Sequence, residues 1–549
     1  MSMASTTHSS RSKRETFNNR LMFMMAAIGS AVGLGNIWRF PYVAYENGGG
    51  AFLVPYLVAL ITAGIPILWF DFAIGHRYRA SAPLAFRRIS RWAEPIGWFK
   101  AGVCFFIAIY YAAIVAWAGL YTVKSFNTAW GDDPESYLME EFLKLDAAST
   151  FSGEFVTPIL LTLIGVWVFS IIVLALNVNK GIGALTLVFV PVLIVLFAIM
   201  VVRALFLDGA LEGLNALFTP DWSVLTDSSV WIAAYGQIFF SLSVGFGIMI
   251  TYASYLKART NLTGTGSVTA FANSSFELLA GIGVFATLGF MAVASGVAVD
   301  EVASSGIGLA FIAFPTIINE MPMGALFGVL FFGSLFLAGI TSLISIQEVV
   351  FAALREKLGW SRSMTAIVFG GLMGILSTVL FASTSGLVIL DIMDKWTNNL
   401  GIVFCATVAL LVVGWVTGRR NEIAQHLNAV SSLRVGAVWE FCAFILTPVT
   451  LIIMLVLEVK SMLAEPYEGY ASAQLNLYGW GVVAAIIVAG IILSVLPYSK
   501  RTTTDGIPGS DFGVPPKGRK KGEPNPLAAD TAVNAATTAT VDSSATSRS

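Results

Sequence analysis

The chain has 549 residues, of which 56% belong to the hydrophobic set and only 12% are charged. A soluble chain of this length would need about twice that share of charged residues to cover its surface, so a soluble enzyme is excluded. The formal net charge of -1 says little, because the loops and ends of a membrane protein face different compartments.

Apolar segments separated by charged or turn-rich breaks approach or reach the length that crosses about 30 Å of hydrocarbon as a helix. In chain order these segments cover residues 17–45, 51–76, 98–128, 155–177, 181–206, 231–256, 268–298, 324–354, 364–383, 386–417, 435–459 and 475–497. The sequence therefore predicts an all-α polytopic membrane protein with a twelve-helix domain over residues 17–497. The polar ends, 1–16 and 498–549, are predicted to be disordered.

The basic residues are distributed unevenly between the two sides of this arrangement. Twenty-six of the 32 Lys and Arg residues, Lys100 among them, fall in the two ends and in alternate loops, and four fall in the other loops. The positive-inside rule therefore predicts a multi-pass protein of the cell membrane with both termini cytoplasmic. The remaining two, Arg39 and Lys395, fall within spans, where a charge is costly and is a candidate for function.

Residues that could carry chemistry are sparse. The three cysteines lie in predicted spans and the three histidines, His8, His76 and His426, are far apart in the chain, so neither a disulfide nor a metal cluster is expected. The sequence has no catalytic nucleophile arrangement, no phosphate loop and no nucleic-acid motif, so we expect no enzyme activity and no nucleic-acid partner.

A short motif occurs twice, as Ala31-Val-Gly-Leu-Gly35 in the first span and as Ser243-Val-Gly-Phe-Gly247 in the sixth. Each glycine weakens a helix by about 1 kcal/mol relative to alanine, and lipid cannot satisfy the backbone groups that a break releases. Close packing through small residues is the alternative. Recurrence at the first helix of each five-span half favours two broken helices and an inverted repeat of spans 1–5 and 6–10.

Three stretches, residues 29–41, 46–52 and 236–247, resemble the neurotransmitter:sodium symporter family (SNF), in its bacterial amino-acid branch. The resemblance extends from about residue 14 to residue 497. It implies a secondary active symporter in which Na⁺ moving down its gradient drives the uptake of a small amino acid by alternating access.

The resemblance also implies two Na⁺ sites built from hard oxygen donors, which a hard cation prefers. The first site is implied to use Ala31, Asn36, Ser241 and Asn273, together with the substrate carboxylate. The second is implied to use Gly29, Val32, Ala338, Thr341 and Ser342. Ala338, Thr341 and Ser342 have the spacing i, i+3, i+4 and so share one helix face.

Eleven substrate contacts are implied in the same way: Ala31, Leu34, Gly35, Ile107, Tyr111, Phe240, Ser241, Ser243, Phe246, Ser342 and Ile346. Monoamine carriers of the family have an aspartate where this chain has Gly33, so a monoamine is disfavoured and the substrate brings its own carboxylate. The side-chain end of the pocket would be formed by Ile107, Phe246 and Ile346, which favours a neutral, apolar amino acid. Tyr110 is interpreted as ordinary packing.

Two gates are implied. Arg39 and Asp394 would close the outer side, and Arg14 with Glu356, supported by Tyr255, would close the cytoplasmic side. Lys395 has no implied role beyond pairing with its neighbour Asp394. Glu277 lies four residues after Asn273 on the same helix face. Chloride-dependent relatives carry a neutral hydroxyl residue at that place, so Glu277 is expected to replace chloride and to make transport independent of it.

Two other classes of function remain open. A channel would need a continuous pore, which paired gates oppose, and a transporter-fold amino-acid sensor would bind a partner through the tail. Concentrative uptake that depends on Na⁺ would separate symport from both. The sequence leaves open which neutral amino acid is preferred, the Na⁺ stoichiometry, any proton counter-transport and the oligomeric state.

Overall fold

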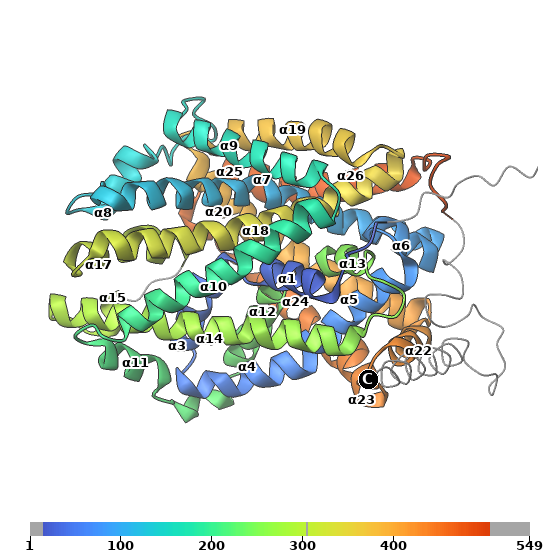
Figure 1. Cartoon of the computed structure of the whole chain (residues 1–549), viewed down its shortest axis with the longest axis horizontal. Coiled ribbons are helices and arrows are strands. Elements are labelled where there is room, and N and C mark those ends of the chain that lie inside the picture. The colour runs from blue at the N-terminus through green and yellow to red at the C-terminus, as the bar shows by residue number, and fades with distance from the viewer. Residues whose placement is uncertain (1–14, 303–305, 505–549) are drawn as a thin grey trace, which may run out of the picture.

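A computed structural model describes residues 15–302 and 306–504. Arg14 and most of the two predicted disordered ends lie outside these residues. Within them the chain is helical, and its only β pairings are two isolated bridges, between Gly49 and Pro220 and between Phe155 and Ser383. The long helices run roughly parallel to one another along the horizontal axis of Figure 1.

Ten helices of the described chain are long and apolar enough to cross a membrane. They cover Gly50–Tyr78 (ending in α5, Ile65–Tyr78), Arg91–Asn127 (α7, Glu94–Lys124), Thr157–Ala175 (α9), Asn179–Ala204 (α10, Ala184–Ala204), Leu262–Ser295 (α14), Gly324–Leu358 (α18), Arg362–Phe381 (α19), Gly386–Val416 (α20, Gly386–Lys395, and α21, Val403–Leu411), Ala437–Gly469 (α24, Thr447–Ala464) and Ser472–Val495 (α26, Gly481–Val495). The pair Arg20–Ala31 and Leu34–Glu46, bent by 56°, makes an eleventh if it is one span.

The first and sixth predicted spans are both interrupted at the repeated motif. In the first, two residues lie between the end of α1 (Arg20–Ala31) and the start of α2 (Leu34–Trp38). In the sixth, α12 (Ser228–Ser241) and α13 (Ile248–Ala253) are separated by six residues, in which Gly245 has φ +90° and Gly247 has φ +104°. Neither half of the sixth segment is long enough to cross a membrane alone.

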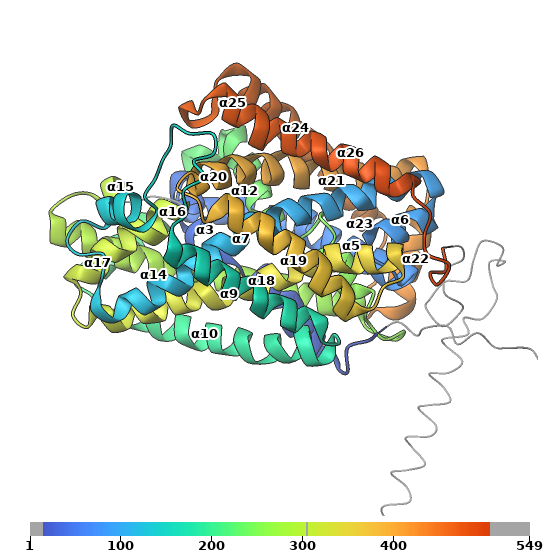
Figure 2. The ribbon, with the colours of Figure 1, turned by 90° about the horizontal axis from the view of Figure 1, so that it is seen from above.

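Helices α7 and α18 pack together at the centre of the bundle. Helices α1 and α10 pack on α18, α19 packs on both α7 and α18, and α14 packs on α1 and α10. The peripheral helices α24 and α26 form one edge of the molecule (Figure 2). Exposed apolar side chains cover the outward faces of α9, α10, α19 and α26, among them Val188, Val195, Ile375 and Val495. A surface of this kind is suited to lipid and would be unfavourable in water.

Short helices cover the two ends of the bundle. Helices α11 (Ala210–Phe218) and α17 (Phe314–Glu320) lie at one end, and α6 (Ala82–Ile89) and α22 (Arg420–Val430) at the other (Figure 1). Residues 498–504, which belong to the predicted tail, pack on the end of α18, where the Ser499 N–H donates to the Lys357 carbonyl at 2.9 Å. The two ends of the described chain therefore lie on the same side.

Two histidines that are far apart in the sequence meet in the structure. His76 Nε2 lies 2.9 Å from the Lys257 carbonyl, so it donates, and Nδ1 of the same ring accepts from His426 Nε2 at 2.9 Å. Burial lowers the pKa of His426 well below its usual range. A neutral histidine pair therefore fastens α22 to the C-terminal end of α5.

Two basic residues lie elsewhere than the sequence predicted. Lys100, which was counted with the basic residues of the cytoplasmic side, is fully buried within α7. Lys395 forms an ion pair with Glu458 at 2.7 Å, and the pairing predicted with Asp394 is replaced by this contact between spans ten and eleven.

Gly75 marks a close approach between α5 and α13. A Cβ atom at this position would overlap the Ile250 carbonyl and lie 2.9 Å from the Ala253 Cβ. We therefore expect Gly75→Ala to cost about 1–3 kcal/mol through overpacking and to lower the melting temperature of the detergent-purified protein.

Gly165, on α9, is the matched control, because a Cβ there meets no atom within 4 Å. Gly165→Ala should leave the melting temperature unchanged or raise it slightly, since alanine has the better helix propensity. Equal melting temperatures for the two variants would contradict the close packing of α5 on α13.

Candidate functional site

A cavity of about 390 Å³ lies where the two helix breaks face α7, α18 and α20. All eleven residues that the resemblance implies for substrate contact line it. Residues that the sequence did not single out for substrate contact also line it: Trp38, Tyr110, Ile114, Gln237, Ile307, Leu390, Asp391, Asn398 and Ile402. Tyr110 is thus part of the cavity wall rather than ordinary packing.

One end of the cavity is polar and narrow. The Leu34 N–H lies 3.4 Å from the Tyr111 hydroxyl, and the Ser243 hydroxyl donates to the Ser30 carbonyl at 2.9 Å. A Cβ atom at Gly33 would come within 3.0 Å of Ser342 Oγ and 3.3 Å of the Tyr111 hydroxyl. Any side chain at this position would therefore fill the space between these two hydroxyl groups.

Several residues that line the cavity are apolar. Ile107, Phe246 and Ile346 are each about 95% buried and come from three different segments. Ile114 and Ile402 also line the cavity. A small molecule with one polar and one apolar end fits this division.

A chain of hydrogen bonds joins three of the residues implied for the first Na⁺ site. Asn36 Oδ1 accepts from the Gly33 N–H at 2.9 Å, and Asn36 Nδ2 donates to Asn273 Oδ1 at 2.9 Å. The amide group of Asn273 in turn donates to the Ser241 hydroxyl. The structure thus brings three hard oxygen donors from α2, α12 and α14 together beside the cavity.

The residues implied for the second Na⁺ site also come together. Ser342 Oγ lies 3.3 Å from the Gly29 carbonyl, and Thr341 Oγ1 lies 3.0 Å from the Ala338 carbonyl. Val32, directly after α1, has extended φ and ψ of −72° and 93°, which turns its carbonyl off the helix axis. Hydroxyl and carbonyl oxygens from α1 and α18 are the ligand type that Na⁺ requires.

Glu277 is fully buried beside the first of these groups. Its carboxylate accepts from the Tyr56 hydroxyl, and from Gln237 Nε2 at 2.6 Å. The Tyr56 hydroxyl is also 2.8 Å from Ser274 Oγ. The sequence did not single out Tyr56 or Gln237, although polar groups inside apolar spans are a recognised signal for a site.

In the predicted outer gate, the Arg39 guanidinium lies over the Phe240 ring, 3.9 Å from its centre. Asp394 Oδ1 accepts from Asn398 Nδ2 at 2.6 Å. Arg39 and Asp394 line the same cavity but form no ion pair within 4.0 Å. The two residues of the predicted outer gate therefore face one space without closing it.

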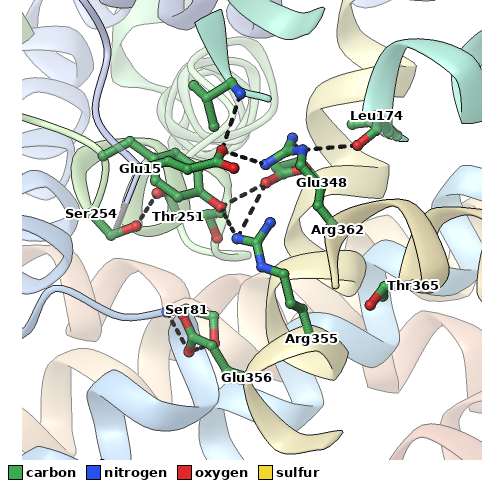
Figure 3. Close-up of polar contacts among 12 residues, drawn as sticks. Glu15, Ser81, Leu174, Thr251, Ser254, Glu348, Arg355, Glu356, Arg362 and Thr365 are labelled. Carbon is green, nitrogen blue, oxygen red and sulfur yellow. Dashed lines mark hydrogen bonds and ion pairs between the residues drawn. The ribbon is translucent and has the colours of Figure 1, made fainter. Parts of the chain in front are cut away.

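On the side predicted to be cytoplasmic, Glu348 is the centre of a buried ion-pair cluster (Figure 3). It accepts from the Tyr255 hydroxyl at 2.6 Å and from Arg362 at 2.8 Å, and Arg355 lies 4.0 Å away. Arg362 also pairs with Glu15 at 3.2 Å, whose carboxylate accepts from the Val178 N–H at 3.1 Å.

Of the predicted cytoplasmic gate, Tyr255 belongs to this cluster, and Arg14 lies outside the described residues. The Glu356 carboxylate accepts from the Ser81 hydroxyl at 2.6 Å and from the Ser81 N–H at 3.0 Å. Glu356 thus ties the end of α18 to the turn before α6. Two other members of the cluster, Glu348 and Arg362, had no predicted role.

Comparison with known proteins identifies the family. The chain matches the sodium:neurotransmitter symporter family over residues 14–140 and 131–502. A sodium-dependent transporter of Methanocaldococcus jannaschii is 36% identical over 482 residues, covering 88% of this chain and 97% of that protein. The sodium-dependent serotonin transporter of Drosophila melanogaster is 30% identical over 510 residues, covering 86% and 81%.

Among solved structures, the crystal structure of MhsT in complex with L-phenylalanine matches with a TM-score of 0.69 and 31% identity, covering 81% of this chain and 99% of that chain. The chain belongs to the sodium:neurotransmitter symporter family. It is therefore a multi-pass membrane transporter coupled to Na⁺, and not an enzyme.

Arg362→Gln should loosen the cytoplasmic cluster, because Glu348 and Glu15 then lose their shared cation and the Leu174 carbonyl loses a donor at 2.8 Å. We expect hydrogen exchange at the 176–183 turn to become several-fold faster, since Glu15 no longer holds the Val178 N–H. Mass spectrometry of the purified protein measures this rate.

Arg203→Gln is the control, because Arg203 is at the opposite end of the bundle and makes only a 3.4 Å contact with the Pro322 carbonyl. Hydrogen exchange at the 176–183 turn of Arg203→Gln should be as slow as in the wild type. Unchanged exchange in Arg362→Gln would show that Arg362 does not restrain this turn.

Proposed function

We propose that this protein takes up a neutral, apolar amino acid together with Na⁺ by alternating access. The observation that carries the proposal is the cavity between the two helix breaks, which combines a narrow polar end with an apolar wall. Oxygen-rich groups of amide, hydroxyl and carbonyl type lie directly beside it. A channel is disfavoured, because the cytoplasmic side is occupied by a buried ion-pair cluster.

We propose twelve spans with both termini cytoplasmic, counting α12 and α13 as the two halves of the sixth. Spans 1–5 and 6–10 would then form an inverted repeat whose first helices are both interrupted. The position of both described ends on one side of the bundle supports an even number of crossings. The cytoplasmic assignment rests on the excess of Lys and Arg on that side.

The substrate class follows from the two ends of the cavity. The gap between Gly33, Tyr111 and Ser342 suits a small carboxylate, and a side chain at position 33 would occupy it. Ile107, Phe246 and Ile346 offer no hydrogen-bond partner to a polar side chain. The L-phenylalanine named with MhsT is consistent with an apolar amino acid here.

The two oxygen groups are proposed as two Na⁺ sites. Asn36, Asn273, Ser241 and the Ala31 carbonyl would bind the first ion, and a substrate carboxylate in the gap beside Gly33 would complete its shell. Gly29, Val32, Ala338, Thr341 and Ser342 would bind the second. Arg39 and Asp394 are proposed to close over the cavity once it is filled, and the Glu348 cluster with Glu356 to open when it empties inward.

Glu277 is proposed to make transport independent of chloride. Its carboxylate supplies the negative charge beside the first ion group and occupies the position to which the Tyr56 hydroxyl and Gln237 Nε2 point. An external anion would have to displace a carboxylate that already uses both donors. Like charge and lack of space therefore exclude chloride from this position.

Asn36→Ala removes one oxygen donor and the link to Asn273, so Na⁺ should bind more weakly. We expect the Na⁺ concentration for half-maximal binding of a radiolabelled apolar amino acid to rise at least about tenfold, which corresponds to about 1.4 kcal/mol. Scintillation proximity on purified protein measures this concentration.

Asn47→Ala is the matched control, since Asn47 lies at the outer end of the same segment and bonds only the Val43 carbonyl with its side-chain amide. It should bind as the wild type does. Amino-acid binding by the wild type that is indifferent to Na⁺ would overturn the symport proposal.

Glu277→Ser should convert the protein to chloride dependence, because the Tyr56 and Gln237 donors then face an uncharged space large enough for an anion. Uptake into proteoliposomes by this variant is expected to fall several-fold in gluconate and to recover in chloride. Glu277→Gln, which removes the charge but fills the space, should lose uptake without recovery. A wild type that requires chloride would refute the assigned role of Glu277.

A further inference from the structure

Lys100 is a fully buried base that the proposed transport cycle does not use. It lies on α7 seven residues, or two helical turns, before the cavity residue Ile107. Its ammonium group donates to the Gly245 carbonyl in the break of the sixth segment and lies 3.4 Å from the Cys405 carbonyl of α21. A buried ammonium group requires such acceptors.

Asp71 on α5 bonds the same residue of the break as Lys100 does. Its Oδ2 accepts from the Gly245 N–H at 3.0 Å. One residue of the break is therefore held at its N–H by an acid and at its carbonyl by a base. These contacts replace the helical hydrogen bonds that the break removes.

The clamp on Gly245 extends to the cavity wall. Gly245 has φ +90°, and a Cβ atom there would come within 2.8 Å of the Ala406 Cβ, so the chain has little freedom at this point. The next residue, Phe246, has its carbonyl bonded to the Cys104 thiol at 3.2 Å, and its side chain lines the cavity. Lys100 and Cys104, one turn apart on α7, thus hold two consecutive peptide groups.

We propose that Lys100 is a positioning residue, a tethered cation that fixes the Gly245–Phe246 backbone and thereby sets the size of side chain that the cavity accepts. It acts through Phe246 and does not touch the substrate. The substrate-size part of this proposal rests on the proposed transport of an apolar amino acid.

Truncating Lys100 and then adding propylammonium, which replaces the atoms removed, separates a positioning role of Lys100 from a merely structural one. Lys100→Ala lacks the atoms of propylammonium, whereas Lys100→Met fills the space without a charge. Binding of a radiolabelled apolar amino acid to Lys100→Ala is expected to weaken at least about tenfold, since hydrogen bonds to charged groups are the stronger ones. Millimolar propylammonium should restore most of the affinity in Lys100→Ala but none in Lys100→Met.

Competition with small and large apolar amino acids provides the size readout. In Lys100→Ala the preference between alanine and phenylalanine should move towards the larger side chain, and propylammonium should reverse the shift. Lys100→Arg, which keeps the charge, should retain more affinity than Lys100→Met. Wild-type affinity and size preference in Lys100→Ala, or a loss that propylammonium fails to reverse in folded protein, would overturn the proposal.

A second measurement does not depend on substrate binding. The Cys104 thiol is buried and bonded to the Phe246 carbonyl, so a fixed break protects it from N-ethylmaleimide. Labelling of Cys104, followed by mass spectrometry, should become several-fold faster in Lys100→Ala and slow again with propylammonium, while labelling of Cys442 stays constant. If the wild type bound no amino acid, this assay would still decide whether Lys100 fixes the break.

Discussion

Two interrupted helices in an apolar interior impose the constraint on which this structure depends. Each break leaves N–H and carbonyl groups that neither lipid nor a regular helix can satisfy. In the first break, Asn36 accepts a hydrogen bond from the Gly33 N–H. In the second, Asp71 accepts from the Gly245 N–H and Lys100 donates to the Gly245 carbonyl. Asn36 itself lines the cavity, whereas Asp71 and Lys100 bond the residue next to Phe246, which lines it.

The same constraint accounts for where the buried charges lie. Asp71 and Lys100 bond the second break, Glu277 bonds Gln237 on the helix that leads into it, and Glu348 collects Arg355 and Arg362. Arg39 and Asp394 remain apart, whereas the cluster around Glu348 is joined through hydrogen bonds. In the proposed cycle, this combination corresponds to a state that is closed at the Glu348 cluster and not yet closed by Arg39 and Asp394.

Local patterns predicted much of this arrangement, and long-range contacts account for what they missed. The repeated glycine motif located both breaks, because the weakness of a helix is a property of a few adjacent residues. Lys100 was counted with the cytoplasmic charges, because a basic residue near the start of an apolar run gives no local sign that it is buried against other helices. Tyr110 and Tyr111 are adjacent and chemically alike, and only the packing of α7 shows that both reach the cavity.

The cluster around Glu348 and the His76–His426 pair could not be read from the sequence, because their members are separated by up to 350 positions. Ala31, Ser241 and Ser342 link the cavity to the proposed ion groups. Each lines the cavity and also belongs to one of the proposed ion groups. A cation that orders these atoms lowers the cost of binding an amino acid there. By thermodynamic reciprocity, the amino acid must tighten the binding of the cation by the same factor, which is the coupling that symport requires.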